Sequence, residues 1–121
     1  MKQIPPQDGE RILVFKEGII QTILGKQKSL EIRGRKMKAG SFWLGCKGQI
    51  NGKALFGDPV PIPDLETWTL FRPKHLVESD VLPYKKTYGM PLLDVTALGT
   101  PIPFKHTPGA VAIVIFRRSE G

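Results

Sequence analysis

Short apolar runs, separated by glycines and prolines, make up most of this chain. Residues 11–15 form an apolar run that predicts a strand. Residues 17–24 place four aliphatic side chains at helical spacing, and Gly25 follows as a natural stop, so we expect a short helix there. Residues 29–33 alternate between polar and apolar side chains, which predicts a second strand.

The middle of the chain predicts two further strands and a second helix. The strands cover residues 41–46 and 50–58, and their glycines suit the tight coiling of a small barrel. We expect the sheet to end at three closely spaced prolines, Pro59, Pro61 and Pro63. Asp64 is placed to cap a short helix over residues 65–71, which Pro73 closes.

The last third is less regular. Residues 76–88 are polar and predict an irregular connection. Strands are expected at residues 91–98 and 111–117, joined by the proline-bounded stretch 100–108. Together these elements predict a mainly β (α+β) fold, a small mixed β-barrel with five to seven strands and two short helices. We expect a single domain over residues 11–118, preceded by a loose N-terminal arm over residues 1–10.

Composition adds a strong positive charge to this picture. The 121 residues include 18 Lys and Arg against 11 Asp and Glu, a formal net charge of +7 with a pI of about 9.8. Such a basic balance is the electrostatic footprint of nucleic-acid binding. No apolar run approaches the roughly 20 residues that span a bilayer, and the N-terminus lacks the apolar core of a signal peptide. We therefore expect a cytoplasmic protein, or a nuclear one in a eukaryote, with no membrane partner.

Several chemistries are disfavoured by what the sequence lacks. Neither a Gly-x-x-x-x-Gly-Lys-Ser/Thr loop nor a Gly-x-Gly-x-x-Gly turn is present, and no spacing of carboxylates suggests a two-metal nuclease. Cys46 is the only cysteine and lies in an apolar strand pattern, which favours a buried thiol over a nucleophile. One cysteine and two histidines make a zinc site improbable. We predict no metal and no cofactor.

The most informative segment is residues 26–38, which carries six basic side chains and one acid, Glu31. It contains the pattern Lys28-x-x-Glu31-x-Arg33. On a strand, Glu31 and Arg33 share one face, while Leu30 and Ile32 point to the other, into the core. Two interpretations stay open: a surface ion pair worth less than about 1 kcal/mol, or an anion site in which Lys28 and Arg33 hold a phosphate or polarise a carbonyl.

Other side chains are candidates for the same ligand. Basic residues beyond the strand can extend a positive track along a nucleic-acid backbone, namely Arg35, Lys36, Lys38, Lys47 and Lys53. Tyr84 and Tyr88 lie in or next to an irregular segment and can stack on bases, whereas Trp43 and Trp68 fit core packing better. His75 and His106 can act as a general base or phosphate donor, or be structural.

Five stretches together resemble the ASCH domain family, a group of PUA-like β-barrels. Residues 12–25 resemble its opening strand and helix, and Lys28-Ser29-Leu30-Glu31-Ile32-Arg33 resembles its signature Lys-x-x-Glu-x-Arg. The glycine-led strands at 40–45 and 50–54, the pair Lys74-His75, and the closing loop 100–110 match in the same order. The resemblance covers roughly residues 11–118.

The resemblance implies a barrel with a cleft beside the first helix, floored by the signature Lys, Glu and Arg. Members of the family are thought to bind RNA or modified nucleosides. Some resemble single-strand ribonucleases, and one branch comprises amidohydrolases that deacetylate N4-acetylcytidine. That branch has a threonine where this chain has Glu31, and a carboxylate is a poor substitute for a hydroxyl nucleophile. Many relatives also carry a tryptophan in the last strand, where this chain has aliphatic residues 112–115.

Three hypotheses for function follow. The first is an RNA-binding module for a single-stranded segment or a modified nucleoside, and the second is a hydrolase of the same architecture, with Lys28 and Glu31 as its catalytic residues. The third is a protein-interaction domain without catalysis. For the first two we expect a cleft with the ligand-binding residues Lys26, Lys28, Glu31, Arg33, Arg35, Lys36, Lys38, Lys53, His75, Tyr88 and His106.

Overall fold

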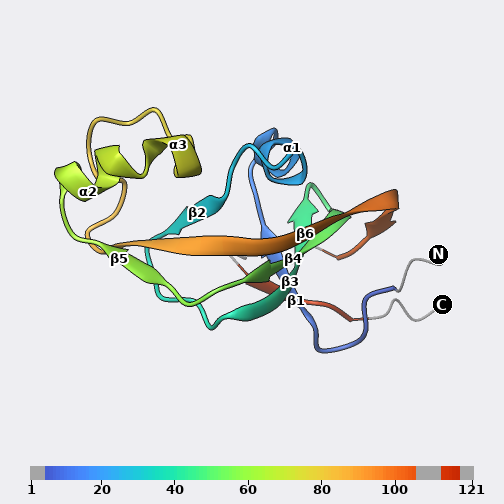
Figure 1. Ribbon diagram of the computed structural model, residues 1–121. Helices are drawn as coiled ribbons and strands as arrows, with labels where there is room; N and C mark the ends of the chain where they lie inside the picture. Colours follow the sequence, from blue (N-terminus) through green and yellow to red (C-terminus); the bar gives the residue numbers. More distant parts are fainter. Residues whose placement is uncertain (1–4, 106–112, 118–121) are drawn as a thin grey trace.

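The computed structural model describes residues 5–105 and 113–117 and consists of a curled sheet with short helices beside it (Figure 1). Its strands are β1 (Arg11–Val14), β2 (Leu30–Arg33), β3 (Gly40–Cys46), β4 (Gln49–Phe56), β5 (Val60–Ile62), β6 (Thr87–Pro103) and β7 (Ile113–Ile115). Its helices are α1 (Ile19–Leu24), α2 (Leu65–Leu70) and α3 (Arg72–His75).

The sheet is mixed. Its strand order is β2-β6-β4-β3-β1-β7, with β5 beside β6, and every pair is antiparallel except β1 with β3. That parallel pair is possible because α1 and β2 lie between the two strands in sequence and form the crossover. In the described part of the chain no pairing joins β2 to β7, so the sheet is a half-barrel. The predicted fold class is confirmed, with α3 as an additional short helix.

β6 is the longest strand and connects the two ends of the sheet. It pairs with β2 and β5 near its start and with β4 further along. The strand therefore extends well beyond the predicted range 91–98, because partners on both edges hold its backbone extended. The prolines after β4 do not end the sheet as predicted. Pro61 lies within the short strand β5, where pairing with β6 on one side tolerates a missing backbone donor.

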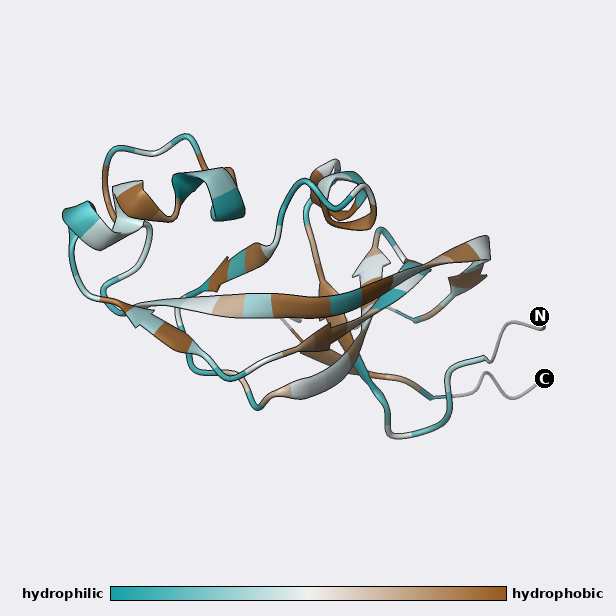
Figure 2. Ribbon diagram, in the orientation of Figure 1, coloured by the Kyte–Doolittle hydropathy of each residue, from teal (hydrophilic) through white to brown (hydrophobic). Residues whose placement is uncertain are grey.

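Buried side chains form three clusters. The first packs between α1 and one face of the sheet and includes Leu13, Phe42 and Phe56. The second lies on the opposite face around Ile12 and Trp43. A third, separate cluster joins β2, β5 and α2 and consists of Leu30, Ile32, Ile62 and Trp68. Figure 2 shows the corresponding hydrophobic segments on the strands and helices, with the connecting loops mostly hydrophilic.

The two helical turns after β5 begin as predicted and continue further. Asp64 caps α2, since its Oδ1 accepts a hydrogen bond from the Thr67 backbone N–H at 2.8 Å. Pro73 does not end the helical segment. It lies in the first turn of α3, where a helix has no use for the missing N–H. As a consequence the backbone turns once more and places His75 against Trp68.

The chain ends also lie near each other where they are described. The Gly9 N–H donates to the Phe116 carbonyl at 3.0 Å, and the Phe116 N–H donates to the Glu10 carbonyl at 2.8 Å. The part of the expected N-terminal arm closest to β1 is thus bonded to the chain that follows β7. Cys46 is partly buried and packs against the first cluster, as a structural thiol would. None of the helices in the described ranges combines the length and apolar character needed to cross a bilayer.

Candidate functional site: a buried ion triad beside a small cleft

β2 separates two environments, as its alternation predicts. Leu30 and Ile32 face the third cluster, while Glu31 and Arg33 face the opposite side, where Arg33 contacts the end of β1. The Arg33 guanidinium lies 5.0 Å from the centre of the Phe15 ring and donates to the Val14 carbonyl at 3.3 Å. Both faces of β2 are covered, so the signature residues do not lie on an open surface.

Lys28, Glu31 and Arg33 form a connected ion triad. Glu31 Oε1 is 3.5 Å from Lys28 Nζ, and Glu31 Oε2 is 2.7 Å from Arg33 Nη2 and accepts from Arg33 Nε at 2.9 Å. The side chains are only 6%, 7% and 16% exposed, respectively. Each carboxylate oxygen lies beside a cation, so Glu31 holds the side chains of Lys28 and Arg33 in position. Two cations and one anion give the triad a net positive charge.

The Lys28 ammonium is held in place by the backbone of α3 as well. Its Nζ donates to the His75 carbonyl at 2.7 Å. Burial lowers the pKa of Lys28 from its usual 10.5, against the opposing effect of the neighbouring Glu31 carboxylate, and Arg33 lowers the same pKa further. An ammonium has three donors, and the His75 carbonyl and Glu31 engage two of them. Among residues 5–105 and 113–117, no other acceptor contacts this ammonium.

His75 itself is part of the scaffold. The residue is fully buried, and its ring stacks on Trp68 with a centroid distance of 3.9 Å. Nε2 lies 2.9 Å from the Trp68 carbonyl, and Nδ1 accepts from the Val77 N–H at 2.9 Å. This pattern fits the neutral ring with its proton on Nε2. Burial lowers the pKa of His75 below 6.5. His75 therefore supports Lys28 through its backbone, and its ring does not reach the cleft.

A small cleft lies directly beside the triad, between the end of α1 and β6. Its volume is about 190 Å³. One wall comes from α1 and the residues before β2, and the other comes from β6; the lining residues are Ile23, Lys26, Lys28, Ser29, Leu92, Leu93, Asp94 and Val95. The Leu92 N–H donates to the Ser29 carbonyl at 2.9 Å and fixes the two walls together. Of the triad, only Lys28 lines this cleft.

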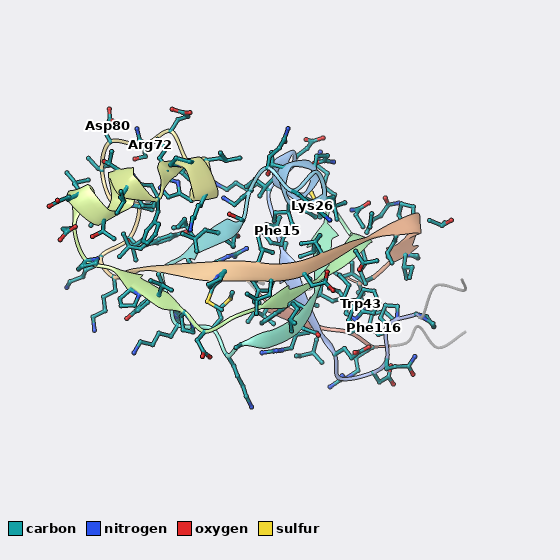
Figure 3. All side chains as sticks on the ribbon, in the orientation of Figure 1. Phe15, Lys26, Trp43, Arg72, Asp80 and Phe116 are labelled. Carbon is teal, nitrogen blue, oxygen red and sulfur yellow. The ribbon has the colours of Figure 1, made fainter. Side chains whose placement is uncertain are left out.

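The remaining predicted site residues are spread over three places. Lys26, which is labelled in Figure 3, follows the end of α1. It lines the cleft, is exposed, and has a left-handed backbone with φ of 61°. Arg35, Lys36 and Lys38 are exposed in the turn after β2, and Tyr88 lies beside them on β6. His106 falls outside the described residues.

Lys53 is not brought to the triad. Its Nζ lies 4.7 Å from the centre of the Trp43 ring and 4.0 Å from Glu10 Oε2. Its neighbour in the strand, Ala54, points into the first cluster, so Lys53 is on the opposite face of the sheet. Trp43 and Trp68 are buried, in agreement with the prediction that both pack in the core.

Sequence reasoning missed half of the cleft. The wall formed by Leu92 to Val95 is far from Lys28 in sequence and is brought there by the pairing of β2 with β6. Asp94 was not among the predicted site residues. The stack of His75 on Trp68 has a sequence signal, since the two residues are seven apart, or about two helical turns.

Comparisons with known proteins bear on the fold. A scan against protein-family models and a search of curated protein sequences each found no match. The crystal structure of ASCH from Zymomonas mobilis matches with a TM-score of 0.72 and 15% identity, over 91% of this chain and 89% of that one. A serine-to-alanine mutant of that protein matches with a TM-score of 0.71 and 16% identity, over 94% and 92%. The likeness agrees with the resemblance drawn from the sequence motifs: the chain has the fold of the ASCH domain.

Proposed function

We propose that this protein binds RNA, as a single-stranded segment or a single modified nucleoside, in the cleft between α1 and β6. The observation that carries the proposal is the Lys28 ammonium, which is nearly buried, fixed by two partners, and present in the wall of a cleft of about 190 Å³. A net charge of +7 attracts a polyanion to the protein as a whole. The ASCH-domain fold is consistent with this class of ligand.

Cations and apolar side chains of the cleft have different roles in this proposal. Lys28 donates its third N–H to a phosphate or carbonyl oxygen of the ligand, and Lys26 adds a second, exposed cation at the rim. Ile23, Leu92 and Val95 offer apolar contact to a base. Glu31 and Arg33 stay beneath the cleft. They hold the Lys28 side chain in one orientation, so little conformational entropy is lost when the ligand binds.

A hydrolase is the second candidate, and one observation favours it. Burial lowers the pKa of Lys28, and a lysine with a lowered pKa is a better general base at neutral pH. In its neutral form Lys28 would accept the proton of an attacking water or hydroxyl. Glu31 would then act as a positioning residue, since both of its oxygens already bind cations. The sequence named Glu31 as a catalytic residue of this candidate, as a general base or as a residue that fixes Lys28, and the second role is the one proposed here.

The test compares Lys28→Met with a matched control. Methionine replaces the unbranched stem of lysine up to Cε and removes the ammonium. Lys53→Met makes the same change on the opposite face of the sheet. Binding is measured by fluorescence anisotropy with labelled single-stranded RNA and by calorimetry with N4-acetylcytidine. A hydrogen bond to a charged group contributes about 1.5–3 kcal/mol, so we expect Lys28→Met to weaken binding at least about tenfold. The Lys53→Met variant should bind like the wild type.

Two further measurements complete the experiment. Lys26→Met alters an exposed residue, so it weakens binding without threatening the fold and checks the cleft if Lys28→Met is unstable. Chromatography of the same mixtures detects cleaved RNA or deacetylated nucleoside. Product formed by the wild type and lost in Lys28→Met would favour the hydrolase. Absence of any retention of RNA or nucleoside at moderate ionic strength would overturn both candidates and favour a protein-interaction domain.

A further inference from the structure

We propose a second RNA contact at the far end of β2, on a surface that we call the basic–aromatic platform. It consists of Arg35, Lys36, Tyr84, Lys85, Lys86 and Tyr88. The platform combines the turn after β2 with the loop that leads into β6. The proposal rests on the proposed function, because it takes RNA as the partner, but it concerns a surface separate from the cleft.

Three contacts bring the two segments of the platform together. Arg33, the last residue of β2, is the register partner of Tyr88 on β6. The Lys36 ammonium lies 5.8 Å from the centre of the Tyr88 ring. Gly34 packs directly on Tyr84: a Cβ atom at Gly34 would lie 2.8 Å from Tyr84 Cδ1. The missing side chain at Gly34 thus lets the basic turn approach the tyrosine ring closely.

The platform is accessible and its charge is not neutralised locally. Arg35, Lys36, Lys85 and Lys86 are all exposed, and no ion pair within 4.0 Å joins any of the four to another described residue. Tyr84 is 46% exposed although it packs on Gly34. Exposed cations on both sides of partly exposed aromatic rings are the combination that binds single-stranded nucleic acid, by contacts to phosphates and stacking on bases.

The position of the platform defines how a strand would run. Lys28 at the cleft and Arg35 in the platform are seven residues apart, and an extended chain rises about 3.3 Å per residue, so the two sites are at most about 23 Å apart. A strand of several nucleotides can reach both. Small β-barrel modules of comparable size cover about 4–16 nucleotides. We infer that the RNA follows the line of β2, with one nucleotide in the cleft and its neighbours on the platform.

The experiment measures affinity against ligand length. A single nucleoside reaches only the cleft, whereas a single-stranded RNA of about 12 nucleotides, within the range of small barrels, reaches both sites. The double variant Lys85→Ala/Lys86→Ala should leave nucleoside affinity unchanged and weaken binding of the longer RNA. Each lost phosphate contact makes the slope of log K against log salt shallower by about 0.7, so the double variant should lose up to about 1.4.

Tyr84→Ala separates stacking from charge. It should weaken binding of the longer RNA roughly tenfold while leaving the salt slope unchanged, because stacking releases no counterions. Lys47→Ala serves as the matched control. Lys47 is an exposed lysine whose side chain pairs with Glu17 elsewhere on the surface. Binding to vesicles that contain anionic lipid tests whether the platform attracts any polyanion and does not prefer RNA.

The outcomes separate this proposal from the one on which it rests. If Lys28→Met weakens binding of the longer RNA and the platform variants do not, the platform is refuted and the cleft stands. If nucleoside is not bound but platform variants weaken binding of the longer RNA, the platform stands and the cleft fails. If anionic vesicles bind as strongly as RNA and Tyr84→Ala has no effect, the surface is only a patch of charge and the proposal is overturned.

Discussion

Removing the charge of Glu31 is the most direct test of the buried triad. The substitution Glu31→Gln keeps the shape of the side chain and leaves Lys28 and Arg33 as buried cations without a counter-charge. These side chains are 6% and 16% exposed, so water can restore little of the lost interaction. Removing one partner of a buried ion pair destabilises a protein by about 3–5 kcal/mol. We expect a loss of that size in the free energy of unfolding.

Such a loss is easy to measure in a domain of this length. The whole free energy of unfolding of a domain is about 5–15 kcal/mol, so the variant loses a large part of it. The corresponding fall in Tm is about 10–20 °C. Urea unfolding followed by tryptophan fluorescence is a suitable assay, because Trp43 and Trp68 are buried in different clusters and report on both. Coincident transitions by fluorescence and by circular dichroism would support a two-state analysis.

The exposed pair of Glu17 and Lys47 supplies a matched control. Its side chains are 75% and 71% exposed and its atoms are 2.9 Å apart, so the pair resembles the triad in geometry but not in burial. Glu17→Gln should change the free energy of unfolding by less than about 1 kcal/mol. The reasoning would be refuted if Glu31→Gln had an effect as small as Glu17→Gln, since burial would then not strengthen these interactions.

Three further predictions concern pH and packing. Burial lowers the pKa of Lys28 from 10.5, so the unfolded chain binds this proton more tightly than the folded protein does. The free energy of unfolding of the wild type, relative to that of Lys28→Met, should therefore rise as the pH increases towards 10.5. A flat difference in urea midpoints over this pH range would contradict the prediction. Burial also lowers the pKa of His75, so the free energy of unfolding should fall as the pH drops below 6.5, by at most about 1.4 kcal/mol per pH unit. NMR of the His75 ring should still show the neutral form at pH 6.5, and a charged ring at that pH would refute the assignment. At Gly52 a Cβ atom would lie 2.9 Å from the Thr96 carbonyl oxygen, so Gly52→Ala should lower the free energy of unfolding, measured by thermal unfolding, by about 1–3 kcal/mol. Gly99→Ala is the control, because a Cβ atom at Gly99 would meet nothing within 4 Å. Equal Tm values for the two variants would contradict the packing argument.

Local sequence signals predicted the elements that depend mainly on neighbouring residues. The alternation over residues 29–33 correctly placed Leu30 and Ile32 on the opposite face from Glu31 and Arg33, because side chains alternate along any strand. Asp64 capped its helix as expected, since the cap bond spans only three residues. The close spacing of the triad residues also made their ion pairs foreseeable.

Features that depend on distant pairing escaped prediction. The prolines after β4 indicated the end of the sheet, yet β5 forms because β6 lies beside it and requires few of its backbone donors. β6 is long for the same reason, with partners on both edges. Lys53 belonged to the expected positive track, but the register of β3 and β4 turns it towards Trp43 on the other face.

The sequence by itself determined that this protein is a basic, mainly β domain with a lysine, a glutamate and an arginine in one short strand. Only the tertiary structure decided that these charges are buried, since the His75 carbonyl of α3 binds Lys28 and the Val14 carbonyl of β1 binds Arg33, both from positions far from β2 in sequence. Burial depends on which surfaces meet, and no local pattern encodes it. The same holds for the cleft, because one wall comes from Lys28 and the other from Asp94 and its neighbours, which meet only when β2 pairs with β6.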